Sequence, residues 1–191
     1  MKNRLLNSLL VLIVTCSFSS CSLFGYDLQE DYDYEYTPGN AYLDQTAYEF
    51  IQSRKEIDMG ILCQAVDRVG FKDEYEAADR TYIVMNDVAF VAYFQTKKYA
   101  GLENMSDKDI KDLLNSLMLE EPVSSLDLTI NPVAMKPINR DKKMYMWINT
   151  VTGYNMRIHY AAVATAGTPV VTSNIRPTNG VIHVVDKYPL N

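Results

Sequence analysis

The chain has few of the residues that build metal or nucleic-acid sites. Its 191 residues include two histidines, three cysteines and one tryptophan, and its lysines and arginines form no dense cluster. Zinc requires three or four ligands in one pocket, and nucleic acid requires clustered cations that neutralise phosphates. With a net charge of −6 as well, the composition argues against a metal site and a nucleic-acid partner.

Motifs of the common enzyme classes are also missing. The sequence contains no nucleophile elbow, no glycine-rich phosphate loop, no HExxH helix and no CxxC pair. Adjacent carboxylates such as Glu120 and Glu121 are typical of a solvated turn. We therefore expect no catalytic residues and no cofactor, and a protein that is not an enzyme.

No apolar run reaches the roughly 20 residues that a membrane-spanning helix needs. The N-terminus instead has a short positive region with Lys2 and Arg4, followed by a mostly apolar segment at 5–14. This order is typical of a secretory signal peptide. Residues 1–20 are therefore predicted to be removed from the mature protein.

The residues that follow the apolar segment resemble the lipobox of bacterial lipoproteins. Small residues Ser19 and Ser20 directly precede Cys21, although Phe18 stands where leucine is usual. The resemblance implies a lipid, such as palmitate, on Cys21 and an anchor in the membrane, since acyl chains bind bilayers through their buried methylenes. Ordinary secretion with cleavage near Ser20 is the alternative, and Cys16 is a weaker candidate for the lipid.

Cys63 would then be the one unmodified cysteine of the mature chain, so no intrachain disulfide can form. It lies among apolar residues at helical spacing and is expected to be a small buried side chain. A reactive thiol is the alternative.

Residues 21–40 form an acidic, tyrosine-rich segment that ends at Pro38-Gly39. Closely spaced like charges repel one another, which favours a solvated, extended tether. Acidic residues shortly after a lipidated cysteine also resemble signals that export lipoproteins to the outer surface of some Gram-negative bacteria. A calcium-binding or adhesive tether is the alternative, but the ligand spacing of a calcium loop is missing.

Residues 41–191 have the pattern of a single α+β domain. Capping residues Thr46, Asn86 or Asp87, and Ser106 predict helix starts, and Gly70 suits the end of a helix that contains Cys63. Runs at about 81–85, 127–135, 143–150, 155–164, 168–173 and 181–187 are rich in strand-forming residues. Helices followed by strands predict helices packed on a mostly antiparallel sheet system.

Two segments of this domain resemble the paired motifs of the fasciclin (FAS1) domain family. They are TYIVMNDVAFVAYF at 81–94 and TSNIRPTNGVIHVVDKYPL at 172–190. The positions that match the motifs are Thr81, Asp87, Ala89, Phe90, Asn179, Gly180, His183 and Asp186. The resemblance implies the FAS1 fold over residues 41–191, with β-sandwich-like sheets and several helices packed against one side or edge.

The chain departs from the family pattern at two places. The usual Tyr-His pair after the central helix is missing from NSLMLEEP at 115–122, and Asn174-Ile175 replaces an Asp-Ile pair used by some animal members in integrin adhesion. We therefore do not expect the integrin mechanism here.

Strand alternation separates the candidate chemical groups. His183 and Asp186 point to opposite faces if their strand is regular, so they cannot form a catalytic relay there. His183 is expected to be structural rather than catalytic or metal-binding. In the strand at 143–150, Tyr145 and Trp147 share one face, which could stack on sugar rings if it is exposed, or could pack inside the fold.

Two hypotheses for function follow from the sequence. In the first, the chain is a surface lipoprotein of the outer membrane that acts as a non-catalytic adhesion or binding module for an extracellular glycan or protein. In the second, it is a structural accessory subunit of an outer-membrane protein complex, with no ligand of its own. Exposed aromatic side chains at Tyr145 and Trp147 would favour the first hypothesis, and a wide apolar patch the second.

Overall fold

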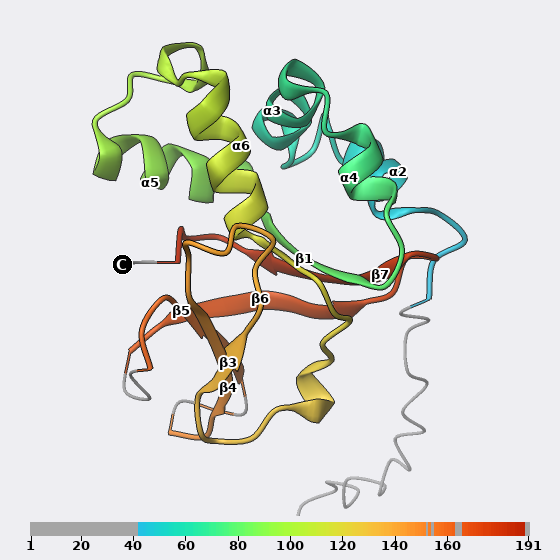
Figure 1. Cartoon of the computed structure of the whole chain (residues 1–191), viewed down its shortest axis with the longest axis vertical. Helices are drawn as coiled ribbons and strands as arrows, with labels where there is room; N and C mark the ends of the chain where they lie inside the picture. The colour runs from blue at the N-terminus through green and yellow to red at the C-terminus, as the bar shows by residue number, and fades with distance from the viewer. Residues whose placement is uncertain (1–41, 152, 154, 163–165, 190–191) are drawn as a thin grey trace, which may run out of the picture. The chain divides into compact units, whose positions relative to one another are not determined.

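The computed structural model describes residues 42–151, 153, 155–162 and 166–189, all within one compact unit at 39–191 (Figure 1). The predicted signal peptide, Cys21 and the tether therefore lie outside the described residues. The helices are α2 Ala47–Ser53, α3 Gly60–Val69, α4 Lys72–Glu76, α5 Asp87–Lys97 and α6 Asp107–Ser116, with short 3-10 helices at Leu102–Asn104 and Ser125–Asp127. The strands are β1 Arg80–Met85, β2 Met118–Leu119, β3 Val133–Met135, β4 Met144–Asn149, β5 Asn155–His159, β6 Thr168–Ile175 and β7 Gly180–Val185.

The predicted helix caps are confirmed. Thr46 and Glu49 form a capping box at the start of α2, Asn86 accepts from the Ala89 N–H at the start of α5, and Ser106 accepts from the Asp109 N–H at the start of α6. Each cap supplies an acceptor to backbone N–H groups that have no partner within the helix. At the end of α3, Gly70 adopts the left-handed conformation with φ 68°.

The strands form one sheet in the order β2-β1-β7-β6-β5-β4-β3. Among the named strands, β1 and β7 are the one parallel pair, so the expectation of a mostly antiparallel system is confirmed. The sheet nearly closes on itself, because β2 at one end reaches the chain just beyond β3 through a bridge between Leu119 and Pro137. The sequence predicted sandwich-like sheets, and the structure has one curled sheet whose two halves face each other as the layers of a sandwich do.

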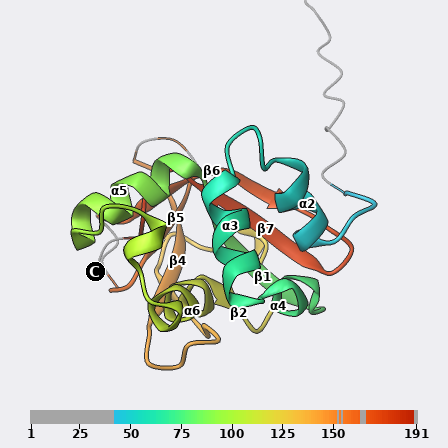
Figure 2. The same ribbon diagram turned by 90° about the horizontal axis from the view of Figure 1, so that it is seen from above.

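In Figure 1 the helices lie on one side of β1 and β7, and Figure 2 views the molecule from that side, with α3 in front of these strands. Residues Val181 to Val185 of β7 are buried at every position, on both faces of the strand. A central strand covered on both sides is expected to be apolar throughout rather than alternating. The helices therefore cover one face of β7, and the curled half of the sheet covers the other.

Two predicted strands differ in extent. The run at 127–135 begins with the 3-10 helix Ser125–Asp127 and becomes a strand only at Val133, directly after Pro132, which has no N–H to donate to a ladder. The strand predicted at 155–164 ends at His159, where Nδ1 of the ring accepts from the Ala161 N–H at 2.8 Å and turns the chain.

Candidate functional site

The motif histidine lies in the core. His183 is 0% exposed, and its Nδ1 accepts from the Asn174 backbone N–H at 3.3 Å. Nδ1 is therefore unprotonated, so Nε2 carries the hydrogen and donates to the Val123 carbonyl at 2.9 Å. Burial lowers the pKa of the imidazole to about 4. Both ring nitrogens are used within the fold, which fits a structural role.

Asn174 continues this network at a bulge in β6. Its φ is 61°, and its side-chain oxygen accepts from the Ser125 N–H at 2.8 Å while its amide nitrogen donates to Ser125 Oγ at 2.6 Å. The position that replaces the adhesive aspartate of some animal members thus ties the bulge to the segment at 123–125.

Thr81 ties the same segment to β1. Its hydroxyl donates to the Glu121 carbonyl and accepts from the Val123 N–H, each at 2.7 Å. Because the hydroxyl both donates and accepts, one buried side chain satisfies two backbone groups of the neighbouring loop.

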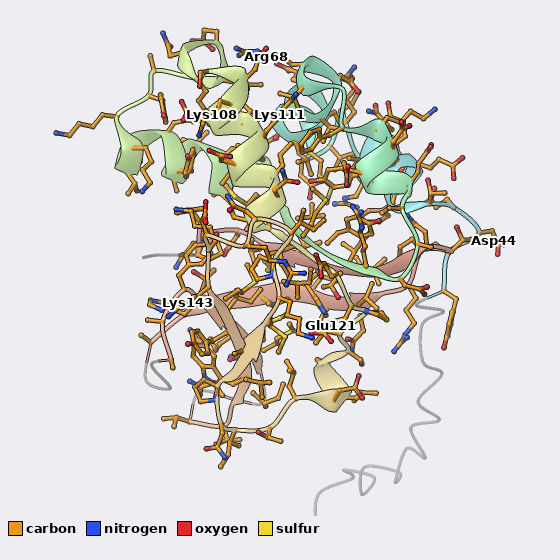
Figure 3. All side chains as sticks on the ribbon, in the orientation of Figure 1. Asp44, Arg68, Lys108, Lys111, Glu121 and Lys143 are labelled. Carbon is orange, nitrogen blue, oxygen red and sulfur yellow. The ribbon has the colours of Figure 1, made fainter. Side chains whose placement is uncertain are left out.

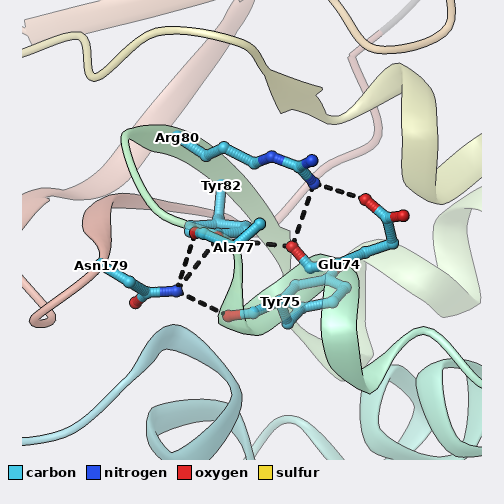
Figure 4. Close-up of polar contacts among 6 residues, drawn as sticks. All are labelled: Glu74, Tyr75, Ala77, Arg80, Tyr82 and Asn179. Atoms are coloured by element: carbon cyan, nitrogen blue, oxygen red, sulfur yellow. Dashed lines mark hydrogen bonds and ion pairs between the residues drawn. The ribbon is translucent and has the colours of Figure 1, made fainter.

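Asn179 joins three segments that are distant in sequence (Figure 4). Its amide nitrogen lies within 2.9 Å of the Tyr75 carbonyl and 3.1 Å of both the Ala77 carbonyl and the Tyr82 hydroxyl. Its oxygen accepts from the Ala47 N–H at 2.8 Å, in the first turn of α2. The side chain is 8% exposed and holds α2, the end of α4 and β1 together.

Three further motif residues organise the first strand-helix unit. The Asp87 carboxylate accepts from the N–H groups of Gly60 and Ile61, at 3.2 and 2.8 Å, in the first turn of α3. Ala89 and Phe90, next along α5, are fully buried. This cap between two helices is not apparent from sequence, because 26 or more residues separate the partners.

Gly180 lies close against the backbone of β1. A Cβ built at this position would lie 2.1 Å from the Arg80 carbonyl oxygen, so no larger residue fits without moving a strand. Asp186 follows β7, and its buried Oδ1 has no hydrogen-bond partner among the described residues. Apart from Asp186, the matching positions all hold parts of the scaffold together.

Cys63 is 0% exposed, as expected for a small buried side chain, and its thiol donates to the Ile51 carbonyl. Burial raises the pKa of the thiol to about 11, which keeps it protonated at neutral pH.

The candidate ligand site is a cleft of about 560 Å³. Four segments line it: α5, β5, the start of β6 with the two residues before it, and the residues after β7. The lining residues are Ala92, Thr96, Arg157, His159, Ala166, Gly167, Thr168, Pro169, Lys187 and Tyr188. We call this the α5–β5 cleft.

The outer face of β4 and β5 forms one side of this cleft. Register pairs Tyr145 with His159 and Trp147 with Arg157, and residues directly opposite in a sheet share a face. Pro169 of β6 pairs with Arg157 and continues the row. The predicted face with Tyr145 and Trp147 therefore exists and leads to the cleft.

Of the two alternatives for this face, packing inside the fold is the one that holds for the tryptophan. Trp147 is 1% exposed, and a Cβ added at Gly167 would come within 2.6 Å of its ring. The closely packed chain at Gly167 covers the indole, whose Nε1 is buried without a hydrogen-bond partner among the described residues. Tyr145 is half-buried, so the pair offers no open stacking platform.

Two cationic side chains, Arg157 and Lys187, and the imidazole of His159 line the cleft. Arg157 is held by donation from Nε to Asn155 Oδ1 and from Nη1 to the Gly167 carbonyl, both at 3.0 Å. His159 lies two positions further along β5, and Lys187 is exposed beside Tyr188. Among the residues that the structure describes, no aspartate or glutamate lines the cleft.

A group of tyrosines fixes the wall at Tyr188. Its ring meets Tyr93 edge-on with centroids 4.7 Å apart, and Tyr160 lies 6.0 Å away. Lys97 lies 5.9 Å from the centre of the same ring. Burial raises the pKa of the Tyr188 phenol, so the hydroxyl stays neutral at physiological pH.

Sequence reasoning missed most of this cleft. The spacing of Arg157 and His159 was a usable signal, since residues two apart in a strand share a face. Nothing local links them to Thr96, Lys187 or Tyr188, which come from other elements.

Charged side chains are spread widely over the rest of the surface. Figure 3 shows Arg68, Lys108 and Lys111 among the helices, and Lys143 close to the start of β4. Within the described part of the chain, no group of three histidine, cysteine, aspartate or glutamate side chains is placed to hold a metal ion. The same residues include no helix that is long and apolar enough to cross a membrane.

Comparison with known proteins identifies the domain. The Fasciclin domain family matches residues 58–188, more than half of the chain. The chain belongs to the fasciclin domain family. Fasciclin domains are generally adhesion-related and non-enzymatic, and the α+β FAS1 fold expected from the two motifs is confirmed.

One solved structure is similar to this fasciclin domain. A FAS1 domain pair from the insect cell adhesion molecule Fasciclin I matches with 10% identity and a TM-score of 0.46. The match covers 76% of this chain and 45% of that one, so the chain spans less than half of the insect pair. None of the curated proteins compared with the chain matches it.

Proposed function

We propose that the protein is a lipid-anchored, non-catalytic binding module that captures an extracellular glycan or protein in the α5–β5 cleft. The observation that carries the proposal is the cleft itself, on a domain whose family is adhesion-related. Small-molecule and glycan sites are typically concave, about 300–1,000 Å³ in volume, and apolar with a few polar groups. The cleft has these properties.

The anchor in this proposal is a lipid on Cys21, in the outer membrane and facing the exterior. Support comes from the sequence alone: the signal-peptide pattern, the small residues before Cys21 and the acidic segment after it. A tether of about 20 residues would let the domain reach ligands beyond the membrane surface.

A glycan and peptide array tests this proposal with the full chain solubilised in detergent. The variant Thr96→Trp places a large ring at the exposed rim of the cleft without removing a core residue. Gln95→Trp adds the same bulk to an exposed neighbour that does not line the cleft. We expect binding that Thr96→Trp abolishes and Gln95→Trp preserves. A silent array, or equal binding by both variants, would reject the cleft as a capture site.

The second function, an accessory subunit of an outer-membrane complex, is supported by a separate surface. Leu126, Ile130 and Val151 are 85%, 61% and 90% exposed. Leu126 and Ile130 line an apolar groove with Ile148 of β4, and Val151 follows the end of this strand. Exposed apolar groups of this kind are common where proteins meet partners.

Affinity purification from detergent-solubilised envelopes separates the two functions. An accessory subunit should bring down one partner in stoichiometric amount, and Leu126→Glu should release it while Thr96→Trp does not. A capture module should be recovered without such a partner.

A further inference from the structure

We infer that the α5–β5 cleft recognises a carboxylate carried on a sugar ring, as in a uronate residue of an acidic polysaccharide. This inference rests on the proposed function and names the ligand class of the same site.

The charge of the cleft points to an anion. Among the described residues that line it, the ionisable side chains other than the Tyr188 phenol are Arg157, His159 and Lys187, and all three are of basic residue types, in a protein whose net charge is −6. A local positive site on an acidic protein is not explained by the overall composition. Asp186, next to Lys187, is not a lining residue, and the Tyr188 phenol stays neutral because burial raises its pKa.

The geometry favours a carboxylate. Arg157 and His159 alternate on β5 with Ile158 between them, so their side chains leave the same face about 7 Å apart at the backbone. Nε and Nη1 of Arg157 donate to Asn155 and Gly167, which orients the guanidinium. A guanidinium carries five N–H donors in a planar fork, and that fork suits the two oxygens of a carboxylate. His159 accepts from Ala161 through Nδ1, which leaves Nε2 as its donor.

The remaining lining favours a ring as the carrier of that carboxylate. Tyr188, Pro169 and Ala92 give the cleft an apolar surface beside the cations. Contacts with Tyr93 and Tyr160 fix the Tyr188 ring in place. A rigid sugar with an apolar C–H face and a carboxylate at one edge loses little conformational freedom on such a surface, whereas a flexible acidic side chain loses more.

Isothermal titration calorimetry of the full chain in detergent tests the inference. The probe is tetragalacturonate at about 0.15 M salt, where non-specific attraction between exposed charges is screened. Its carboxyl-reduced neutral counterpart tests the charge, monomeric galacturonate tests whether a free sugar acid suffices, and tetraglutamate tests whether the carrier must be a sugar.

We expect tetragalacturonate to bind and the neutral counterpart to bind at least about tenfold more weakly, because charge-assisted hydrogen bonds are lost. Lys187→Gln, at an exposed position, and Arg157→Gln should each weaken binding about tenfold, with circular dichroism confirming the fold. Lys72→Gln removes the same charge from exposed α4 and should leave affinity unchanged. In both ribbon views α4 lies apart from α5 (Figures 1 and 2).

Each contrary outcome has a distinct meaning. Equal binding of the acidic and neutral sugars, blocked by Thr96→Trp, would overturn the carboxylate assignment but keep the cleft as a binding site. Equal binding of tetraglutamate would replace the sugar by an acidic peptide. No binding of tetragalacturonate would overturn the inference, while a positive array result blocked by Thr96→Trp would still support the proposed function.

Discussion

His183 shows how a residue with chemical potential is used for structure. It is buried, both ring nitrogens are bonded within the fold, and its network reaches Asn174 and Val123. A charged imidazole would lose the Nδ1 acceptor that the Asn174 N–H requires and would lie in an apolar environment. The folded state therefore holds the neutral ring.

The neutral ring makes stability depend on pH. An unfolded histidine titrates near 6.5, whereas His183 in the folded protein titrates at about 4. Between these values the unfolded chain binds more protons, so the free energy of unfolding falls as the pH drops, by about 3 kcal/mol in total. Above pH 6.5 this contribution is complete.

Urea denaturation of the full chain in detergent, at pH 7 and at pH 4.5, measures this loss. His183→Gln should be less stable at pH 7, because the Asn174 N–H loses its acceptor, and should lose less stability on acidification than the unchanged protein. Carboxylates titrate in both proteins, so the test compares how much free energy of unfolding each protein loses between pH 7 and pH 4.5. Equal losses in the two proteins would show that His183 does not cause the pH dependence of stability.

At the scale of elements, α3 depends on another helix for its start. Its N-cap residue Met59 makes no side-chain cap, and the Asp87 carboxylate of α5 accepts from Gly60 and Ile61 instead. The carboxylate also lies at the positive end of the α3 dipole. One motif residue thus fixes the packing of two helices.

Asp87→Ala should therefore lower the free energy of unfolding by about 1–2 kcal/mol, the usual effect of removing a helix cap. Asp87→Asn keeps one acceptor and should have a smaller effect. Hydrogen exchange at the Gly60 and Ile61 amides should speed up in Asp87→Ala, together with the fall in urea midpoint. As a control, Asp73→Ala removes an exposed carboxylate from α4 and should change stability by less than about 0.5 kcal/mol. Unchanged amide exchange in Asp87→Ala would contradict the cap.

At the scale of the whole molecule, the proposed anchor predicts where the protein is found. A mature chain without Lys2 and Arg4 is still more acidic than −6, so anionic lipid headgroups repel it and acyl chains must supply the attachment. Two or more chains anchor a protein stably, whereas one chain binds reversibly.

Cys21→Ala should therefore release the protein from the membrane fraction, measured by fractionation and immunoblot after expression in a Gram-negative host. Cys16→Ala is the matched control and should leave the protein in the membrane fraction. Retention of Cys21→Ala in the membrane would contradict the lipoprotein proposal.

The sequence by itself determined the local structure and the family. Helix starts at Thr46, Asn86 and Ser106 follow from hydrogen bonds that reach only three residues along the chain, so their signal is contiguous. The motif at 179–186 identifies the domain in the same way, because its residues lie together on one strand and its turn.

Tertiary structure alone decided which surfaces are available for binding. Alternation correctly placed Tyr145 and Trp147 on one face, but the chain at Gly167 covers Trp147, and no local pattern encodes that contact. The α5–β5 cleft likewise joins Thr96, Arg157 and Lys187 from three separate parts of the chain. Strand order and register bring them together, and these depend on how the whole sheet curls and pairs rather than on the residues next to each one.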